Sequence, residues 1–256
     1  MLRSILATSL CLGGALAAPV AETTCTRDFL KAQTDAYVAA QVAGKPDGLK
    51  AASDAATYTQ NFKASTLASG ILATPLAVAH NRSTFDTTQC ATYTEMIVTA
   101  GTPHVIGTQM RFDNSSGALT KVETLVTSKG DWLFDAAGTL KYASQEDWGE
   151  IAEDKRDSRE VIQAVGDAYL DLFNDKNVKV PWGTPCARLE GGSYVQPCSA
   201  GIPSGIKHVN RRYVIDEVLG AVDIMFDFAG ADPDSHEFRV EGGDIRFVHT
   251  ITVMTS

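Results

Sequence analysis

The chain has 256 residues, of which 31 are Asp or Glu and 22 are Lys or Arg, so its formal net charge is −9. The acidic residues are dispersed and there is no basic patch, which argues against a nucleic-acid partner. After the N-terminal apolar run, no stretch approaches the roughly 20 apolar residues that a membrane-spanning helix needs, so we expect no membrane span.

The N-terminus has the pattern of a cleavable signal peptide, residues 1–17. Arg3 precedes a short apolar run, Ile5–Leu16, and a small-x-small cleavage site follows at Ala15–Ala17. The apolar run is too short to cross a bilayer. We therefore expect a protein that is secreted, or that stays in the lumen of the secretory pathway, and whose mature chain begins near Ala18.

Removal of the signal peptide takes Cys11 with it and leaves an even number of cysteines. An even count in an oxidising compartment predicts disulfides. The four remaining cysteines are Cys25, Cys90, Cys186 and Cys198. Spacing does not fix the pairing, but Cys25–Cys90 and Cys186–Cys198 are favoured because each pair lies within one half of the chain. The sequons at Asn81 and Asn114 predict N-glycosylation in the same compartment.

Each half of the chain is predicted to begin with an amphipathic helix. The first spans about residues 27–42 and is ended by Gly44 and Pro46. The second spans about residues 158–173, where Asp157 or Ser158 can cap its start. Both helices contain the tripeptide Asp-Ala-Tyr.

An irregular segment follows each helix, and strand-like segments and a hairpin come after it. The corresponding segments are 82–86 and 212–216, 93–98 and 222–226, 110–113 and 238–241, and 122–127 and 248–253. Several landmarks in the same order predict a duplicated unit. We therefore expect an α+β protein of two tandem units, 18–147 and 158–256, with a charged linker at 147–157. In each unit a curved antiparallel sheet would fold over the helix and leave a cone-shaped apolar pocket.

The second half carries motifs that resemble a known family. They are Trp182-Gly-Thr-Pro-Cys-Ala-Arg-Leu-Glu-Gly-Gly, Arg211-Arg-Tyr-Val-Ile-Asp-Glu, Asp234-Ser-His-Glu-Phe-Arg-Val-Glu and Ile245-Arg-Phe-Val-His-Thr. Over about residues 158–253 their order resembles secreted fungal proteins whose fold is similar to nuclear transport factor 2 and ketosteroid isomerase. The first half resembles a divergent copy.

The resemblance extends to the ketosteroid-isomerase-like dimerising cyclases of fungal maleidride biosynthesis. Those enzymes join two maleic-anhydride-bearing polyketide monomers. The resemblance thus implies a small-molecule substrate and a role in secondary metabolism. It also implies sheets that pair back to back, either in a homodimer or between the two units of one chain.

Two histidines are candidate catalytic residues. Strand alternation groups His249 with the apolar residues Ile245, Phe247, Ile251 and Val253, and we expect this row to face the pocket. A desolvated imidazole there can act as an acid or a base, although a core histidine bonded to a backbone carbonyl fits equally well. Glu123 is its counterpart in the first half. His236 shares a face with Phe238 and Val240, so we expect it in the same cavity, although locally it resembles a surface turn residue.

The strand at 211–216 supplies further candidates. Arg212 shares a face with Asp216, and Arg211 shares the other with Tyr213. An inward arginine would bind carboxylate or anhydride oxygens and stabilise an enolate, whereas the alternative is a structural Arg212–Asp216 pair. Asp216 and its counterpart Asp86 are equally candidate bases, because burial in an apolar cone raises a carboxyl pKa. Arg211 and Tyr213 are candidate substrate-binding residues.

A Gly-rich segment is predicted to cover the mouth of the pocket. It contains Trp182, Arg188 and Tyr194, which could contact a substrate, although we favour Trp182 as a plug of the core. The chain has no G-x-S-x-G, H-E-x-x-H, phosphate-binding or dinucleotide-binding motif, and its cysteines lack zinc spacing. We therefore expect neither a metal nor a cofactor.

The leading hypothesis is a cofactor-free isomerase or cyclase that removes a proton next to a carbonyl, with Asp216 or His249 as base. The first alternative is a non-catalytic secreted protein that binds a small ligand. A second alternative is an enzyme that acts on carbohydrate, which would need Asp216 and Glu237 to face each other. Strand alternation does not support that pair.

Overall fold

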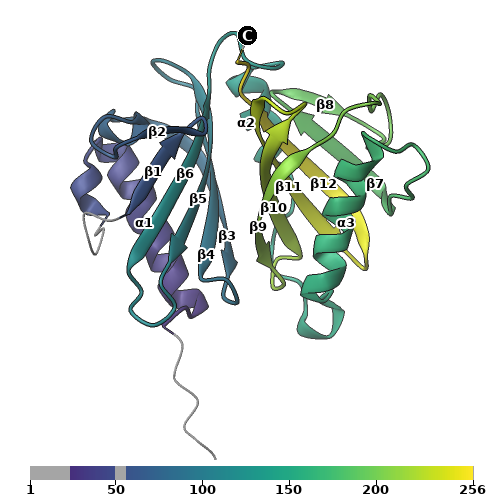
Figure 1. Ribbon diagram of the computed structural model, residues 1–256, viewed down its shortest axis with the longest axis horizontal. Coiled ribbons are helices and arrows are strands. Elements are labelled where there is room, and N and C mark those ends of the chain that lie inside the picture. The colour runs from purple at the N-terminus through teal and green to yellow at the C-terminus, as the bar shows by residue number, and fades with distance from the viewer. Residues whose placement is uncertain (1–23, 50–55, 256) are drawn as a thin grey trace, which may run out of the picture.

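The computed structural model describes residues 24–49 and 56–255, so the expected signal peptide lies outside the described residues. Two sheets stand face to face, and one long helix covers the outer side of each (Figure 1). Within the described ranges, no helix is both long enough and apolar enough to cross a membrane.

The first half begins with helix α1 (Arg27–Ala43). The Thr26 side chain caps it by accepting from the Phe29 N–H, and Gly44 ends it with φ 63°, a backbone conformation that favours glycine. The strands that follow are β1 (Thr57–Gln60), β2 (Lys63–Ser65), β3 (Val78–Asp86), β4 (Ala91–Val98), β5 (His104–Phe112) and β6 (Leu119–Thr127). A short helix, α2 (Ala136–Ala143), comes after them.

The second half begins with helix α3 (Arg159–Leu172), which is capped by the side chain of Ser158. Its strands are β7 (Trp182–Glu190), β8 (Ser193–Val195), β9 (Val209–Asp216), β10 (Ala221–Phe228), β11 (Asp232–Glu241) and β12 (Asp244–Thr252). Short 3-10 turns lie at Pro46–Gly48, Ile71–Ala73 and Glu153–Lys155.

The two sheets have the same strand order. The first is β2-β1-β6-β5-β4-β3 and the second is β8-β7-β12-β11-β10-β9. The expected α+β protein with two tandem sheet–helix units is therefore confirmed. The expectation of purely antiparallel sheets was wrong, because β1 runs parallel to β6 and β7 runs parallel to β12. The segment expected to be a loop over the pocket is largely this parallel strand β7 and its hairpin partner β8.

Both faces of each sheet are buried. The outer faces pack on the helices, with Tyr37 of α1 and Tyr169 of α3 in the two cores. The inner faces pack on each other, where Tyr93 and Leu125 of the first sheet meet Met225 and Ile251 of the second. The sheets are thus paired back to back within one chain.

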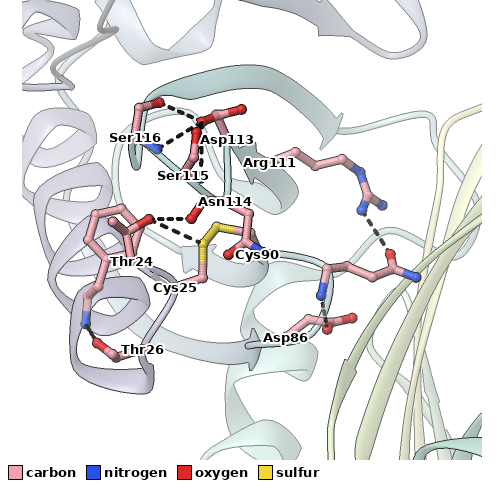
Figure 2. Close-up of a disulfide and its surroundings, with 12 residues drawn as sticks. Thr24, Cys25, Thr26, Asp86, Cys90, Arg111, Asp113, Asn114, Ser115 and Ser116 are labelled. Carbon is pink, nitrogen blue, oxygen red and sulfur yellow. Dashed lines mark hydrogen bonds between the residues drawn. A yellow bond between two sulfur atoms is a disulfide. The ribbon is translucent and has the colours of Figure 1, made fainter. Parts of the chain in front are cut away.

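Each half contains one disulfide. Figure 2 shows Cys25–Cys90, which joins the start of α1 to the turn between β3 and β4. Cys186–Cys198 joins β7 to the segment after β8. These are the pairs that the sequence favours, and two disulfides fit a secreted protein. The sequon residue Asn114 is exposed in the turn between β5 and β6, and Asn81 is exposed on β3.

Candidate functional site

A cavity of about 340 Å³ opens at one end of the second sheet, on the face that α3 covers. Its volume lies in the range of small-molecule sites. Its walls come from strands β7, β11 and β12, from the end of α3 and from the segment at 201–206. The lining residues are Trp132, Phe173, Arg188, Glu190, Gly201, Ile202, Pro203, Ile206, Phe228, Asp232, His236, Thr250, Thr252 and Met254.

The segment 198–206 forms the roof of the cavity and is tied down at both ends. At its start, the Cys186–Cys198 disulfide is reinforced by Arg188, whose Nη1 donates to the Cys198 carbonyl at 2.6 Å. At its end, the Ile206 N–H donates to the Phe173 carbonyl at 3.1 Å. Lys176 Nζ also donates to the Ile202 carbonyl at 2.9 Å. The cavity therefore has a fixed roof.

A buried histidine–carboxylate pair stands in the cavity wall. Asp234 and His236 are two residues apart on β11 and so point to the same face of the sheet. His236 Nδ1 lies 2.7 Å from Asp234 Oδ1, and Thr252, the cross-strand neighbour of Asp234, donates its hydroxyl to Oδ2 at 2.6 Å. Because a carboxylate only accepts, Nδ1 carries the hydrogen.

This arrangement leaves the other imidazole nitrogen available. His236 Nε2 makes no hydrogen bond to any residue that the structure describes, and His236 lines the cavity. In the neutral tautomer fixed by Asp234, the Nε2 lone pair can accept a proton. A pair with this geometry is able to act as a general base.

Arg188 is another polar residue of the cavity wall, and Tyr169 lies behind the wall in the core. Arg188 is 4% exposed, and its Nε lies 2.8 Å from Glu190 Oε1. The Tyr169 ring lies 5.5 Å from the His236 ring between centroids. Burial raises the pKa of the Tyr169 hydroxyl, and the nearby charge of Arg188 offsets only part of that effect, so the phenol stays protonated.

A second histidine lies behind the cavity wall. His208 is buried against Phe173, Phe226 and Phe228, with ring centroids 4.7–4.8 Å apart, and neither of its nitrogens has a hydrogen-bond partner among the described residues. Burial lowers its pKa to about 3, so this imidazole is neutral. It packs as an aromatic ring.

The first half has different chemistry at the equivalent positions. Matching the sheet registers places Thr108 where the second half has His236, and Ile106 where it has Asp234. The Thr108 hydroxyl lies 2.6 Å from the Tyr37 hydroxyl and donates to Thr124 at 3.0 Å. These hydroxyl groups bond to one another, and the histidine–carboxylate pair is found at these positions in the second half alone.

His249 does not lie in this cavity. A β-bulge at Arg246 shifts the alternation of β12, so that Ile245 faces α3 while His249 and Ile251 face the first sheet. His236 and His249 are therefore on opposite faces, and the expected shared cavity was wrong.

His249 instead belongs to a buried charge cluster between the sheets. Its Nδ1 lies 2.9 Å from Glu95 and its Nε2 lies 2.6 Å from Glu146. Burial lowers the pKa of His249, but the two carboxylates outweigh burial and raise it to about 9. The other members of the cluster are Arg82, which bonds to Glu237 at 2.5 Å, and Trp148, whose ring lies 3.7 Å beneath the Arg82 guanidinium.

Asp216 and Asp86 also lie between the halves and outside the cavity. Asp216 accepts from the Phe85 N–H at 2.9 Å and from Arg27 at 2.8 Å. Asp86 accepts from the Ile215 N–H at 2.9 Å and from Arg159 at 2.7 Å. Each aspartate thus holds the opposite strand and the first residue of the opposite helix. The expected place of Asp216 in an apolar cone was wrong, because this side of β9 faces the first sheet.

The two adjacent arginines of β9 face opposite sides, as alternation predicts, but neither lines the cavity. Arg212 pairs with Glu123 of the first sheet at 3.0 Å, so the alternative Arg212–Asp216 pair does not form. Arg211 binds Asp167 of α3 at 2.6 Å, and the Tyr213 hydroxyl donates to the same carboxylate at 2.8 Å.

The residues expected to cover the mouth of the pocket, Trp182, Arg188 and Tyr194, do not lie together. Trp182 packs edge-to-face on Tyr169 with centroids 5.7 Å apart, as expected of a plug of the core. Tyr194 stacks on Tyr142 of α2, with ring centroids 4.3 Å apart.

Of the residues expected at the site, the structure brings His236 and Arg188 together at the cavity. Sequence reasoning missed Asp234, although its position two residues before His236 in a strand is a readable signal.

Residues 155–252 match a protein family described as a domain of unknown function, DUF8021. The matched region contains α3, the second sheet and all the polar residues of the cavity wall, but not Trp132. No curated protein matches the chain. Within the described ranges, no three His, Cys, Asp or Glu side chains come together as metal ligands.

Proposed function

We propose that the second cone, with a fold like that of nuclear transport factor 2, is the active site of a cofactor-free isomerase or cyclase. The observation that carries this proposal is the buried Asp234–His236 pair, whose free Nε2 belongs to a largely apolar cavity. Such a pair needs no metal or cofactor to remove a weakly acidic proton from carbon.

His236 is the general base of the proposed reaction. Its Nε2 takes a proton from a carbon next to a carbonyl, and Asp234 stabilises the imidazolium that forms. The electron pair moves onto the carbonyl oxygen, where Arg188 stabilises the enolate charge with N–H groups that the roof and Glu190 do not use.

Two outcomes follow from the enolate. In an isomerisation, the imidazolium returns the proton to a different carbon, and nothing is gained or lost overall. In a cyclisation, the nucleophilic carbon forms a bond to an electrophilic carbon of a second bound monomer, and the imidazolium protonates the resulting anion. A second proton removal and a second addition within the joined pair then close the ring. The protein contributes proximity in the second case. The maleic-anhydride-bearing monomers implied by the sequence resemblance suit this chemistry, because their oxygens are hydrogen-bond acceptors and their chains are apolar.

The test compares small molecules from the source organism with and without the gene, then restores the gene as wild type, His236→Gln or His104→Gln. We expect a lost product and an accumulated carbonyl-bearing monomer, restored by wild type and by His104→Gln, a histidine outside the cavity. His236→Gln should fail to restore the product. With the purified protein, solvent deuterium should enter the monomer next to its carbonyl about 10²–10⁴-fold more slowly in His236→Gln.

An unchanged metabolite profile, or equal exchange rates in wild type and His236→Gln, would contradict the proposal. If the monomer binds without any exchange, the protein is the non-catalytic ligand-binding alternative.

A further inference from the structure

The rim of the cavity contains an exposed tryptophan from the other half of the chain. Trp132 lies between β6 and α2, yet it lines the cavity of the second half together with Met254. Trp132 is 50% exposed and Met254 is 36% exposed. An exposed large apolar side chain next to a pocket indicates an interaction site more often than an isolated apolar side chain elsewhere on the surface does.

The backbone around Trp132 is fixed. Asp131 accepts from the Met254 N–H and from the Ser128 N–H, both at 2.8 Å. The Trp132 carbonyl packs on the turn between β7 and β8, where a Cβ on Gly191 would come within 2.4 Å of it. Gly191 has φ +58°, so the turn needs glycine for both conformation and space. The indole is therefore held at the rim by contacts that do not involve the indole itself.

The cavity lining includes buried polar residues and exposed apolar residues. The polar end contains His236 and Arg188, which are 3% and 4% exposed. The more exposed part of the lining includes Ile202 and Pro203 of the roof and the half-exposed Trp132. Glu190 balances the charge of Arg188, so the polar end suits a neutral hydrogen-bond acceptor better than a second charge.

We infer that the ligand is an amphipathic carbonyl compound that enters with its carbonyl first, and that Trp132 of the first half contacts its apolar tail. This inference rests on the proposed function only in using the same cavity. The first half then supplies part of the binding site, and Trp132 selects for tail length.

The test uses the fluorescent ketone prodan as the probe and displaces it with 2-undecanone or 2-hexanone. Trp132→Ala should weaken 2-undecanone about tenfold and change 2-hexanone less than twofold. Leu133→Ala is the matched control, because Leu133 is 49% exposed beside Trp132 but does not line the cavity. It should leave both ketones unchanged, and Trp132→Phe should recover most of the affinity for 2-undecanone.

Equal loss for both ketones would mean that Trp132 acts on the shape of the cavity rather than on the tail. Equal effects of Trp132→Ala and Leu133→Ala, or no displacement of prodan from wild type, would also overturn the inference. Because these are binding measurements, they stay separate from the proposed catalysis. If His236→Gln exchanges deuterium as fast as wild type, the proposed catalysis is wrong, but the effect of Trp132→Ala on ketone binding can still hold. If Trp132→Ala has no selective effect on binding, the inference is wrong, but the proposed catalysis can still hold.

Discussion

At the residue scale, Asp234 decides what His236 can do. One of its oxygens fixes the imidazole tautomer and the other accepts from Thr252, so both are occupied by groups of the same sheet. A buried carboxylate needs such partners, because an unsatisfied polar group in the interior is costly. The orientation of His236 thus depends on Asp234 of its own strand and, through Asp234, on Thr252 of the neighbouring strand.

Thr252→Val should destabilise the protein by about 1–3 kcal/mol, because it leaves one oxygen of buried Asp234 without a donor. Thr250→Val is the matched control on the same face of β12. The Thr250 hydroxyl is buried and has no hydrogen-bond partner among the described residues, so its replacement should leave the free energy of unfolding unchanged or raise it. Urea denaturation measures both, and equal losses in the two variants would contradict the role given to Thr252.

The sequence identified His236 and Arg188 at the site but not Asp234 or Tyr169. Pro233 before Asp234 suggested a turn, whereas β11 already begins at Asp232. Tyr169 fitted the apolar stripe of its helix and gave no separate signal. The contacts of Asp234 and Tyr169 with His236 depend on how the strand and the helix pack, which the local sequence does not show.

At the element scale, the roof over the cavity depends on the Cys186–Cys198 disulfide. The roof has little regular structure of its own, and its contacts are to β7 and to the end of α3. A cross-link that closes a short loop stabilises mainly by restricting the unfolded chain. In the folded protein the same cross-link ties the start of the roof to β7, and so limits how far the roof opens.

The double variant Cys186→Ser/Cys198→Ser should lower the free energy of unfolding by about 3 kcal/mol on the chain-entropy model. Amide hydrogen exchange should rise most over residues 198–206. The double variant Cys25→Ser/Cys90→Ser is the control, because it opens a loop of 65 residues and should cost about 4 kcal/mol without affecting the roof. An unchanged exchange rate in the roof would contradict its dependence on the disulfide.

Sequence periodicity located the two long helices and the eight central strands, because capping residues and alternating patterns mark them. It could not say which face of β12 meets the cavity. Alternation distinguishes core from solvent, whereas here both faces are buried, as in β4, where every residue is buried. The bulge at Arg246 then exchanged the faces within one strand. The parallel strands β1 and β7 were missed because their pairing depends on contacts far along the chain.

At the scale of the whole molecule, the two halves are joined by charge as well as by apolar packing. His249 donates from both ring nitrogens to carboxylates, one of them Glu95 of the first sheet, and is therefore an imidazolium. Its pKa of about 9 in the folded protein is above the value of 6.5 expected of a free histidine. The folded protein thus binds this proton more tightly than the unfolded chain does.

The stabilisation from His249 should be fully present below pH 6.5 and should be lost as the pH rises through about 9. The shift corresponds to a contribution on the order of 3 kcal/mol. The difference in the free energy of unfolding between wild type and His249→Gln should therefore be larger at pH 6 than at pH 10. His104→Gln serves as the control, and a difference that does not change with pH would contradict an imidazolium at this position.

The reciprocal aspartate contacts and the shared strand order describe a molecule that has the form of a dimer but is a single polypeptide. In an assembly of two identical chains, every substitution appears twice. Here a change in one half is not copied into the other, so threonine can stand at position 108 and histidine at position 236 in matching places. The second half can therefore carry a histidine–carboxylate pair while the matching positions of the first half carry a threonine and an isoleucine, a difference that two identical chains cannot have.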